Sequence, residues 1–196
     1  MPDKGAVTRE KILRTARQLF HAKGFHAVSI NDLVDAVRMQ KGSLYYHFSS
    51  KDDLARAVFA AASDEFMIFL DQTLTVENSA TALDNFFSSV LDAQVATGFV
   101  GGCLFGNTAL EMSDSDADFA RMVDEVFENW IHKLADVVEE AQRQNQIGKE
   151  FSSRALAIHI IATIEGGIMM SRLQKDETPL RQSLETLRSL LGLHDS

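Results

Sequence analysis

The scarcity of proline constrains the fold of this chain more than any other feature of its sequence. Proline breaks a helix when it stands in the interior, and the 196 residues contain only Pro2 and Pro179. Between these positions apolar residues recur three or four places apart, which is the period of an amphipathic helix. No segment shows a convincing strand pattern. The sequence therefore predicts an all-α fold of about nine helices.

Capping signals indicate where these helices begin and end. Thr8 is expected to cap the first helix, and Ser29 with Asp32 three positions later resembles a capping box. Ser50 is expected to cap a long fourth helix, and Pro179 suits the first residue of the last one. The helices are expected at about residues 8–23, 30–37, 40–48, 51–74, 79–97, 103–112, 116–144, 152–174 and 179–191.

Basic charge is concentrated in the first three predicted helices. Residues 1–50 carry eight Lys and Arg against four Asp and Glu, whereas residues 51–196 have a net charge of −13. The second and third helices are joined by a tight turn, as in a helix-turn-helix unit. An acidic body would repel phosphates and turn the basic end toward them. The asymmetry therefore favours a nucleic-acid-binding end on an acidic body.

Other features of the sequence bear on its compartment. The single cysteine, Cys103, rules out an intrachain disulfide framework. No apolar run approaches the roughly 20 residues that a membrane span needs, and the first residues lack the apolar core of a signal peptide. We therefore expect a cytoplasmic protein without a membrane partner.

Catalytic and metal-binding motifs are missing from the sequence. It has no Gly-rich phosphate loop, no nucleophile elbow and no Glu-x-x-His pair suited to a di-iron bundle. Glu128 and His132 lie four apart, where an ion pair is favoured over a metal site. We expect no enzyme activity, no metal and no cofactor. The rival classes are an enzyme and a protein-interaction module, and the second would explain the helices but not residues 41–51.

Residues 41–54 read Lys-Gly-Ser-Leu-Tyr-Tyr-His-Phe-Ser-Ser-Lys-Asp-Asp-Leu. Together with residues 8–13, 24–25 and 29–33, this segment resembles the recognition-helix region of TetR-type repressors. The resemblance covers about residues 8–54. It implies a transcriptional regulator, by default a repressor, that binds a palindromic operator in double-stranded DNA as a homodimer and is released by a small-molecule effector.

The predicted DNA contacts lie at the N-terminal end of the third helix, which this kind of motif presents to the major groove. Gly42 allows the backbone to approach DNA closely. Gln40 could pair with a base edge, and Lys41 with guanine or phosphate. Either tyrosine could instead cover the core of the small domain. The predicted DNA-binding residues are Ser29, Arg38, Gln40, Lys41, Gly42, Ser43, Tyr45, Tyr46, His47 and Lys51.

The helix-helix turn departs from the family pattern at two positions. Arg38 stands where the family commonly has glycine, and Gln40 stands where it commonly has a Ser or Thr cap. The departures leave the predicted fold unchanged, but the family pattern no longer predicts the local backbone or the base preference. We hypothesise that Arg38 makes a phosphate or groove contact that glycine could not make.

Two later segments, residues 101–111 and 165–172, resemble stretches in one branch of the same family. The resemblance implies that residues 1–52 form the DNA-binding domain and residues 53–196 an effector-binding and dimerisation domain. It also implies a dimer through the last two helices. Small or branched residues in 154–172 suit that role, and leucines give the last helix an apolar stripe. The stripe could equally serve the intramolecular core.

A ligand pocket needs apolar walls and a few polar anchors, and the C-terminal domain supplies both. Glu165 lies inside an apolar run, so its carboxylate needs a partner or a raised pKa. It could anchor a cationic or hydroxylated ligand, or bond the neighbouring subunit. The predicted effector-binding residues, for a partly apolar effector, are Phe66, Phe69, Phe87, Cys103, Phe105, Asn107, Phe127, Trp130, Glu165 and Met169.

Cys103 supports an alternative function. A thiol at the start of a helix is expected to have a lowered pKa, and some family members with a similar Gly-Cys-Leu segment respond to electrophiles or oxidants. The chain could therefore be a redox-sensing repressor that acts through Cys103. The other interpretation is a small buried hydrophobic residue.

Overall fold

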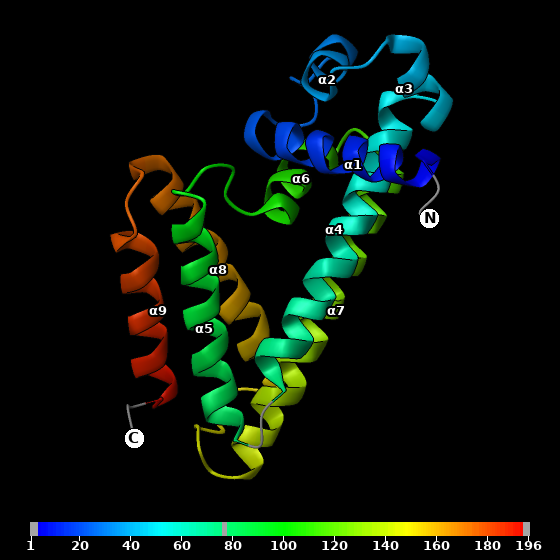
Figure 1. The fold of residues 1–196 in the computed structure, drawn as a ribbon. Helices are drawn as coiled ribbons and strands as arrows, with labels where there is room; N and C mark the ends of the chain where they lie inside the picture. Colours follow the sequence, from blue (N-terminus) through cyan, green and yellow to red (C-terminus); the bar gives the residue numbers. More distant parts are fainter. Residues whose placement is uncertain (1–3, 76–77, 194–196) are drawn as a thin grey trace.

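The computed structural model describes residues 4–75 and 78–193, and all regular structure in these residues is helical. The helices expected from the sequence are confirmed, with ends that shift by a few residues (Figure 1). The helices are α1 (Lys4–Lys23), α2 (Ile30–Val37), α3 (Lys41–His47), α4 (Lys51–Leu74), α5 (Ser79–Ala96), α6 (Leu104–Met112), α7 (Ala117–Arg143), α8 (Ser153–Gln174) and α9 (Thr178–Leu191).

The start of α1 differs from the prediction. The helix begins at Lys4, so Thr8 lies in its second turn rather than at its cap. The capping signal was misleading because Gly5, Ala6 and Val7 continue the helix without any stop residue. The caps expected at Ser29 and Ser50 are confirmed, since Ser29 forms a capping box and the Ser50 side chain accepts from the Asp53 amide. Pro179 is the second residue of α9, not the first, because the helix begins at Thr178.

Helices α1, α2 and α3 form a small head at one end of the molecule (Figure 1). Its core is made by apolar residues that recur at helical spacing, as the sequence predicted. Ile12, Leu33, Val37 and Leu44 are all at most 1% exposed. This core fixes the angle at which α3 is held against α1 and α2.

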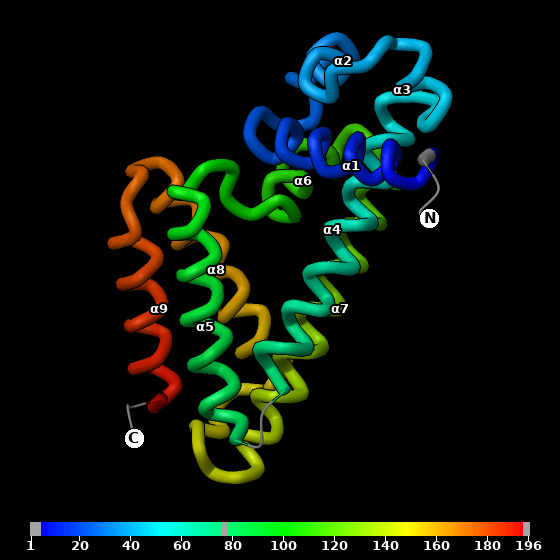
Figure 2. Tube along the Cα trace, viewed as in Figure 1, coloured from blue at the N-terminus to red at the C-terminus, as the bar shows by residue number. Residues whose placement is uncertain are grey.

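Helix α4 joins the head to the body without a break. Its first half buries Leu54, Val58 and Ala62 in the core shared with the head, and its second half buries Leu70 and Leu74 in the core of the body. The path of the chain in Figure 2 shows α4 as one continuous rod alongside α7. The helix therefore belongs to both cores.

The body consists of α5, α7, α8 and α9, with α6 beneath the head (Figure 2). Helix α8 packs against both α7 and α9, and α5 packs against α4, α7 and α9. By length and composition alone α8 could also cross a membrane, so the expectation that no segment reaches that length was wrong. Ile160, Ile164 and Ile168 nevertheless bury one face of α8 in the core of the body.

Candidate DNA-binding surface and effector cavity

Helix α3 presents polar side chains to solvent at its N-terminal end. Leu44 and Phe48 are buried and anchor the helix, while Lys41, Gly42 and Ser43 are exposed. Gln40 is the N-cap, and its side chain makes no capping hydrogen bond. The amide and the lysine therefore remain available to an external partner. We call residues 38–47 the recognition segment.

Tyr45 and Tyr46 lie on the outside of the head. They are 42% and 85% exposed, so covering the core of the small domain is not their main role. The Tyr46 ring meets His47 edge-on at 5.2 Å between ring centres, and the Lys41 ammonium lies 6.0 Å from the Tyr45 ring. Four side chains with hydrogen-bonding tips thus share one exposed surface.

The turn before α3 is formed by a strained residue. Arg38 has φ 58° and ψ 57°, a left-handed conformation that costs a residue with a Cβ roughly 1–2 kcal/mol. Its amide donates to the Asp35 carbonyl, which ends α2. The side chain is exposed, and its guanidinium makes no ion pair or hydrogen bond within residues 4–75 and 78–193.

Ser29 and Lys51 have structural roles in the head. The Ser29 hydroxyl accepts from the Asp32 amide at 3.1 Å, and hydrogen bonds from Ser29 lower the pKa of the Asp32 carboxyl. The Lys51 ammonium donates to the Phe25 and Val28 carbonyls at 3.0 and 3.1 Å. The Ser29 bonds cap α2, and the two Lys51 bonds hold the α1–α2 connection against α4, which the sequence pattern did not indicate.

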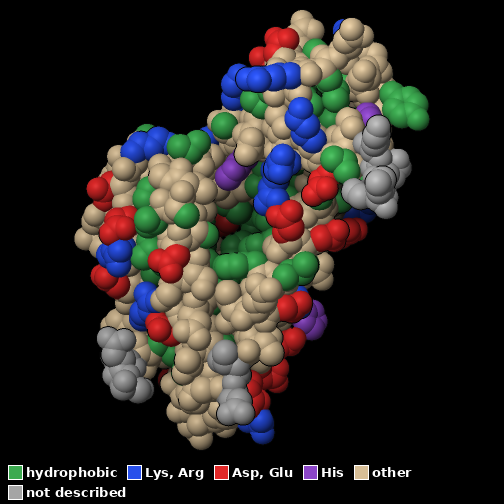
Figure 3. Space-filling view, in the orientation of Figure 1, with side chains coloured by type: hydrophobic (Ala, Val, Ile, Leu, Met, Phe, Trp, Pro, Cys, Tyr) green, Lys and Arg blue, Asp and Glu red, His purple; other side chains and the backbone are tan. Residues whose placement is uncertain are grey.

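A cavity of about 330 Å³ lies in the body, lined from α1, α4, α5, α6, α7 and α8. Figure 3 shows a hollow between the head and the body with hydrophobic side chains at its floor and charged side chains at its rim. Arg17 and Glu65, which both line the cavity, form an ion pair. Six predicted effector-binding residues line the cavity: Phe66, Phe69, Cys103, Phe105, Trp130 and Glu165.

The remaining four predicted effector-binding residues do not line this cavity. Phe87 is fully buried in the core of the body. Phe127 stacks on the Trp130 ring but does not line the cavity itself. Asn107 and Met169 line a neighbouring pocket of about 340 Å³ that also includes Cys103 and Glu165. Periodicity identified these residues as inward-facing or near the pocket but could not say which atoms border empty space.

Three buried polar atoms lack a hydrogen-bond partner in the part of the chain that the structure describes. They are Oε1 of Gln94, Nε1 of Trp130 and Oε1 of Glu165, and all three residues line the cavity of about 330 Å³. Gln94 is not among the residues predicted from the sequence. It continues the apolar stripe of α5 four positions after Val90, so a polar residue on an inward face was the available signal.

The environment of Cys103 is opposite to the one expected from its place at a helix start. Burial raises the pKa of the Cys103 thiol well above its usual value, and the nearby Glu165 carboxylate raises it further. The prediction that the helix start lowers the pKa of this thiol was wrong, because burial and the Glu165 carboxylate raise the pKa by more than the backbone amides of the helix start lower it. A thiol in this state is a poor nucleophile, and nothing in its surroundings favours the redox-sensing alternative.

Helix α6 connects the cavity to the head. Cys103 and Phe105 line the cavity at its start, and Glu111 near its end accepts from the Phe25 and His26 amides at 2.9 and 2.5 Å. A second link joins His21 Nε2 of α1 to the Gly102 carbonyl at 2.7 Å. The sequence pattern did not indicate either contact.

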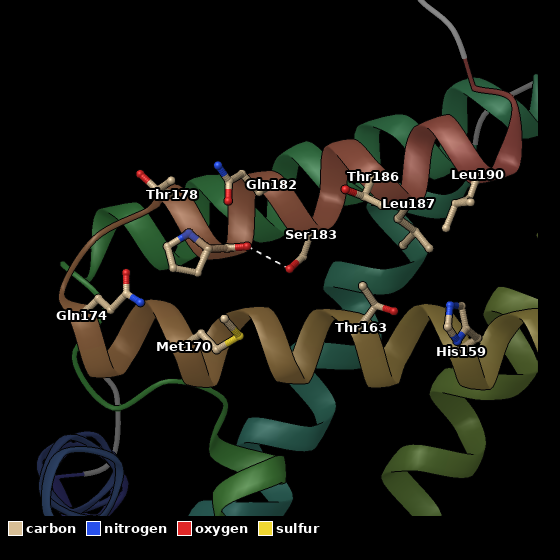
Figure 4. Close-up of a pocket in the computed structure, with 11 residues that line it drawn as sticks. His159, Thr163, Met170, Gln174, Thr178, Gln182, Ser183, Thr186, Leu187 and Leu190 are labelled. Atoms are coloured by element: carbon tan, nitrogen blue, oxygen red, sulfur yellow. Dashed lines mark hydrogen bonds between the residues drawn. The ribbon is translucent and has the colours of Figure 1, made fainter.

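A groove of about 460 Å³ runs between α8 and α9 on the outer surface (Figure 4). Thr163 and Met170 line it from α8, while Ser183 and Leu190 line it from α9. Leu190 is 73% exposed, whereas the other leucines of the α9 stripe are buried in the core of the same chain. Exposed apolar residues elsewhere on α8 are Ile158, Met169 and Leu173.

Comparisons with known proteins agree with this arrangement. The family model for bacterial regulatory proteins of the tetR family matches residues 12–58, and the model for the tetracyclin repressor-like C-terminal domain matches residues 79–187. The chain is thus a helix-turn-helix regulator with a helical C-terminal domain. It belongs to the TetR family of transcriptional regulators.

Two curated relatives and a solved structure are similar to this chain over at least 90% of its length. The transcriptional regulator AcuR of Cereibacter sphaeroides is 28% identical over 187 residues, which cover 94% of this chain and 85% of the relative. The HTH-type transcriptional repressor DhaR of Mycobacterium sp. is 26% identical, covering 90% and 88%. A regulatory protein TetR from Rhodobacter sphaeroides superposes with a TM-score of 0.88 at 26% identity, covering 94% and 98%.

Proposed function

We propose that this regulator is a cytoplasmic, non-enzymatic repressor that binds a palindromic operator as a homodimer and leaves it when a small molecule occupies the cavity. The observation that carries the proposal is the exposed recognition segment, whose lysine, amide and two phenol groups are aimed outward from a buried anchor. Exposed donors of this kind suit phosphates and base edges. The proposed domain division at residues 52 and 53 falls just inside α4.

The dimer is proposed to form through α8 and α9. Ile158 and Ala162 are exposed on α8, and the groove beside them presents Thr163 and Leu190 (Figure 4). Exposed apolar residues on two adjacent helices suit a four-helix interface around a two-fold axis. Ala162→Glu should then convert the dimer to monomer in analytical ultracentrifugation and weaken operator binding. A dimer unchanged by this substitution would contradict the proposed interface.

Coupling between the cavity and the head is proposed to run through α4 and α6. Both helices line the cavity and both contact the head, α6 through the Glu111 carboxylate. An effector that favours a different position of α6 would change the separation of the two recognition segments, and the operator fits only one separation. Operator affinity then falls by population shift.

The experiment selects duplexes with the full-length protein from a random library and then measures affinity by fluorescence anisotropy. We expect a palindromic site, two chains per duplex and a steep loss of affinity with salt. Lys41→Ala combined with Tyr45→Phe should weaken binding by at least about 10-fold at constant salt, since each contact is worth about 1–3 kcal/mol. Lys149→Ala, an exposed lysine of the body, is the matched control. Unselective binding by the wild type would overturn the proposal.

A further inference from the structure

The cavity of about 330 Å³ has aromatic walls and is small for a ligand pocket, since such pockets measure about 300–1,000 Å³. Phe66 meets the Trp130 ring edge-on and the Phe105 ring at a tilt, both at 5.0 Å between ring centres. Phe69 stacks on Phe66 at 6.1 Å. Such walls fit a ligand about the size of one aromatic ring.

The polar atoms of the cavity define the hydrogen bonds that a ligand must complete. Gln94 Oε1 and Glu165 Oε1 are buried acceptors, and Trp130 Nε1 is a buried donor. An unpaired buried polar group costs about 1–3 kcal/mol. A ligand that forms a hydrogen bond with each of these three atoms must carry at least two donor hydrogens and one acceptor.

The charge of Glu165 further restricts the chemical class of the ligand. Burial raises the pKa of the Glu165 carboxyl, and among the described residues only the Cys103 thiol donates a hydrogen bond that lowers it. The nearby basic groups are engaged elsewhere: Arg172 with Asn107, Arg17 with Glu65, and His21 with the Gly102 carbonyl. The carboxylate therefore lacks a positive partner, and the aromatic walls offer electron-rich faces that also attract cations.

We propose that the cavity binds a small organic cation, a protonated alkylamine attached to an aromatic ring, which places its N–H groups on Glu165 and Gln94 and an oxygen acceptor near Trp130. This rests on the proposal that the cavity is the effector site. It also selects one of the roles that the sequence left open for Glu165. Cation binding ranks above binding of a neutral alcohol because only the cation balances the buried carboxylate.

Three probes with the same ring and phenol separate the possible head groups. Tyramine carries an ammonium, tyrosol a neutral alcohol and 4-hydroxyphenylacetate a carboxylate. Trp130 is the single tryptophan of the chain and lines the cavity, so its fluorescence excited at 295 nm reports binding. We expect tyramine to bind at least about 10-fold more tightly than tyrosol, and the anion to bind least.

The variant Glu165→Gln should remove the preference for tyramine over tyrosol. Glu139→Gln, which changes an exposed glutamate of α7, should retain it. Equal or tighter binding of tyrosol or of the anion would overturn the proposed ligand class. So would a tyramine preference that survives in Glu165→Gln, or a failure of all three probes to bind.

The same samples separate this inference from the proposed function. Operator release is measured by anisotropy alongside tyramine binding. If tyramine binds as expected and the operator stays bound, the ligand class stands and the effector role of the cavity fails. If tyrosol or 4-hydroxyphenylacetate releases the operator and tyramine does not, the effector role stands and the cationic ligand class is overturned.

Discussion

The recognition segment and the cavity differ in where their unpaired polar atoms lie. At the recognition segment the side chains of Lys41, Tyr45 and Tyr46 are exposed, and water satisfies them until a partner arrives. In the cavity the free oxygen of Glu165 and the indole nitrogen of Trp130 are buried. Exposed groups can be removed at little cost to folding, whereas changes around buried groups alter stability as well as binding.

Two helical glycines give the largest expected contrast between these regions. A Cβ at Gly106 would collide with the Glu165 carboxylate, with Cδ at 3.1 Å, whereas a Cβ at Gly42 meets nothing within 4 Å. Gly106→Ala should lower the free energy of unfolding by about 1–2 kcal/mol, because displacing the buried carboxylate costs more than the added helix propensity returns. Gly42→Ala should leave it unchanged or raise it by up to about 1 kcal/mol. Urea denaturation measures both values.

A double variant shows whether the collision is the cause. Glu165→Ala removes the carboxylate, so Gly106→Ala should cost much less in that background. An undiminished cost there would mean that α6 tolerates no Cβ at this position for another reason.

The left-handed turn residue gives an intermediate effect at the head. Arg38→Gly and Arg38→Ala both remove the guanidinium, but only glycine relieves the strain at φ 58°. We expect the glycine variant to be about 1 kcal/mol more stable than the alanine variant, which corresponds to about 2–4 °C in Tm. Both should weaken operator binding equally if Arg38 contacts DNA. Unchanged operator affinity in both variants would show that Arg38 does not contact DNA.

The smallest effect is expected from the charge of Glu165. Burial raises the pKa of this carboxyl above its unfolded value. Folding stability from this group is therefore present below the unfolded pKa and is lost as pH rises through the folded pKa. Glu165→Gln should be more stable than the wild type near pH 7.5. The titratable and charged residues that border this site are Cys103, Arg172, Arg17, His21 and Glu65.

Thermal unfolding at several pH values checks this sign. The difference in Tm between Glu165→Gln and the wild type should narrow as pH falls toward the ordinary pKa of a glutamate. A difference that is constant with pH would show that the charge of Glu165 is not its source.

The sequence predicted the head in more detail than the cavity because the signals that define the helices of the head come from residues close together in the sequence. The capping box at Ser29, the cap at Ser50 and the anchors Leu44 and Phe48 are read from neighbouring residues. The cavity is assembled from six helices, and periodicity cannot tell a wall residue such as Phe66 from a core residue such as Phe87. The inward turn of the Lys51 ammonium was missed for the same reason, since its carbonyl partners lie 23 and 26 residues away.

Site-specific photo-crosslinking tests the central claim most directly. Tyr46 on the head and Phe151 between α7 and α8 are both exposed aromatic residues, 85% and 65% respectively. Each is replaced in turn by p-benzoylphenylalanine, and the protein is irradiated on its selected operator duplex. The account predicts crosslinks to DNA from position 46 and none from position 151. Crosslinks from position 151 alone, or equal crosslinks from both, would contradict it.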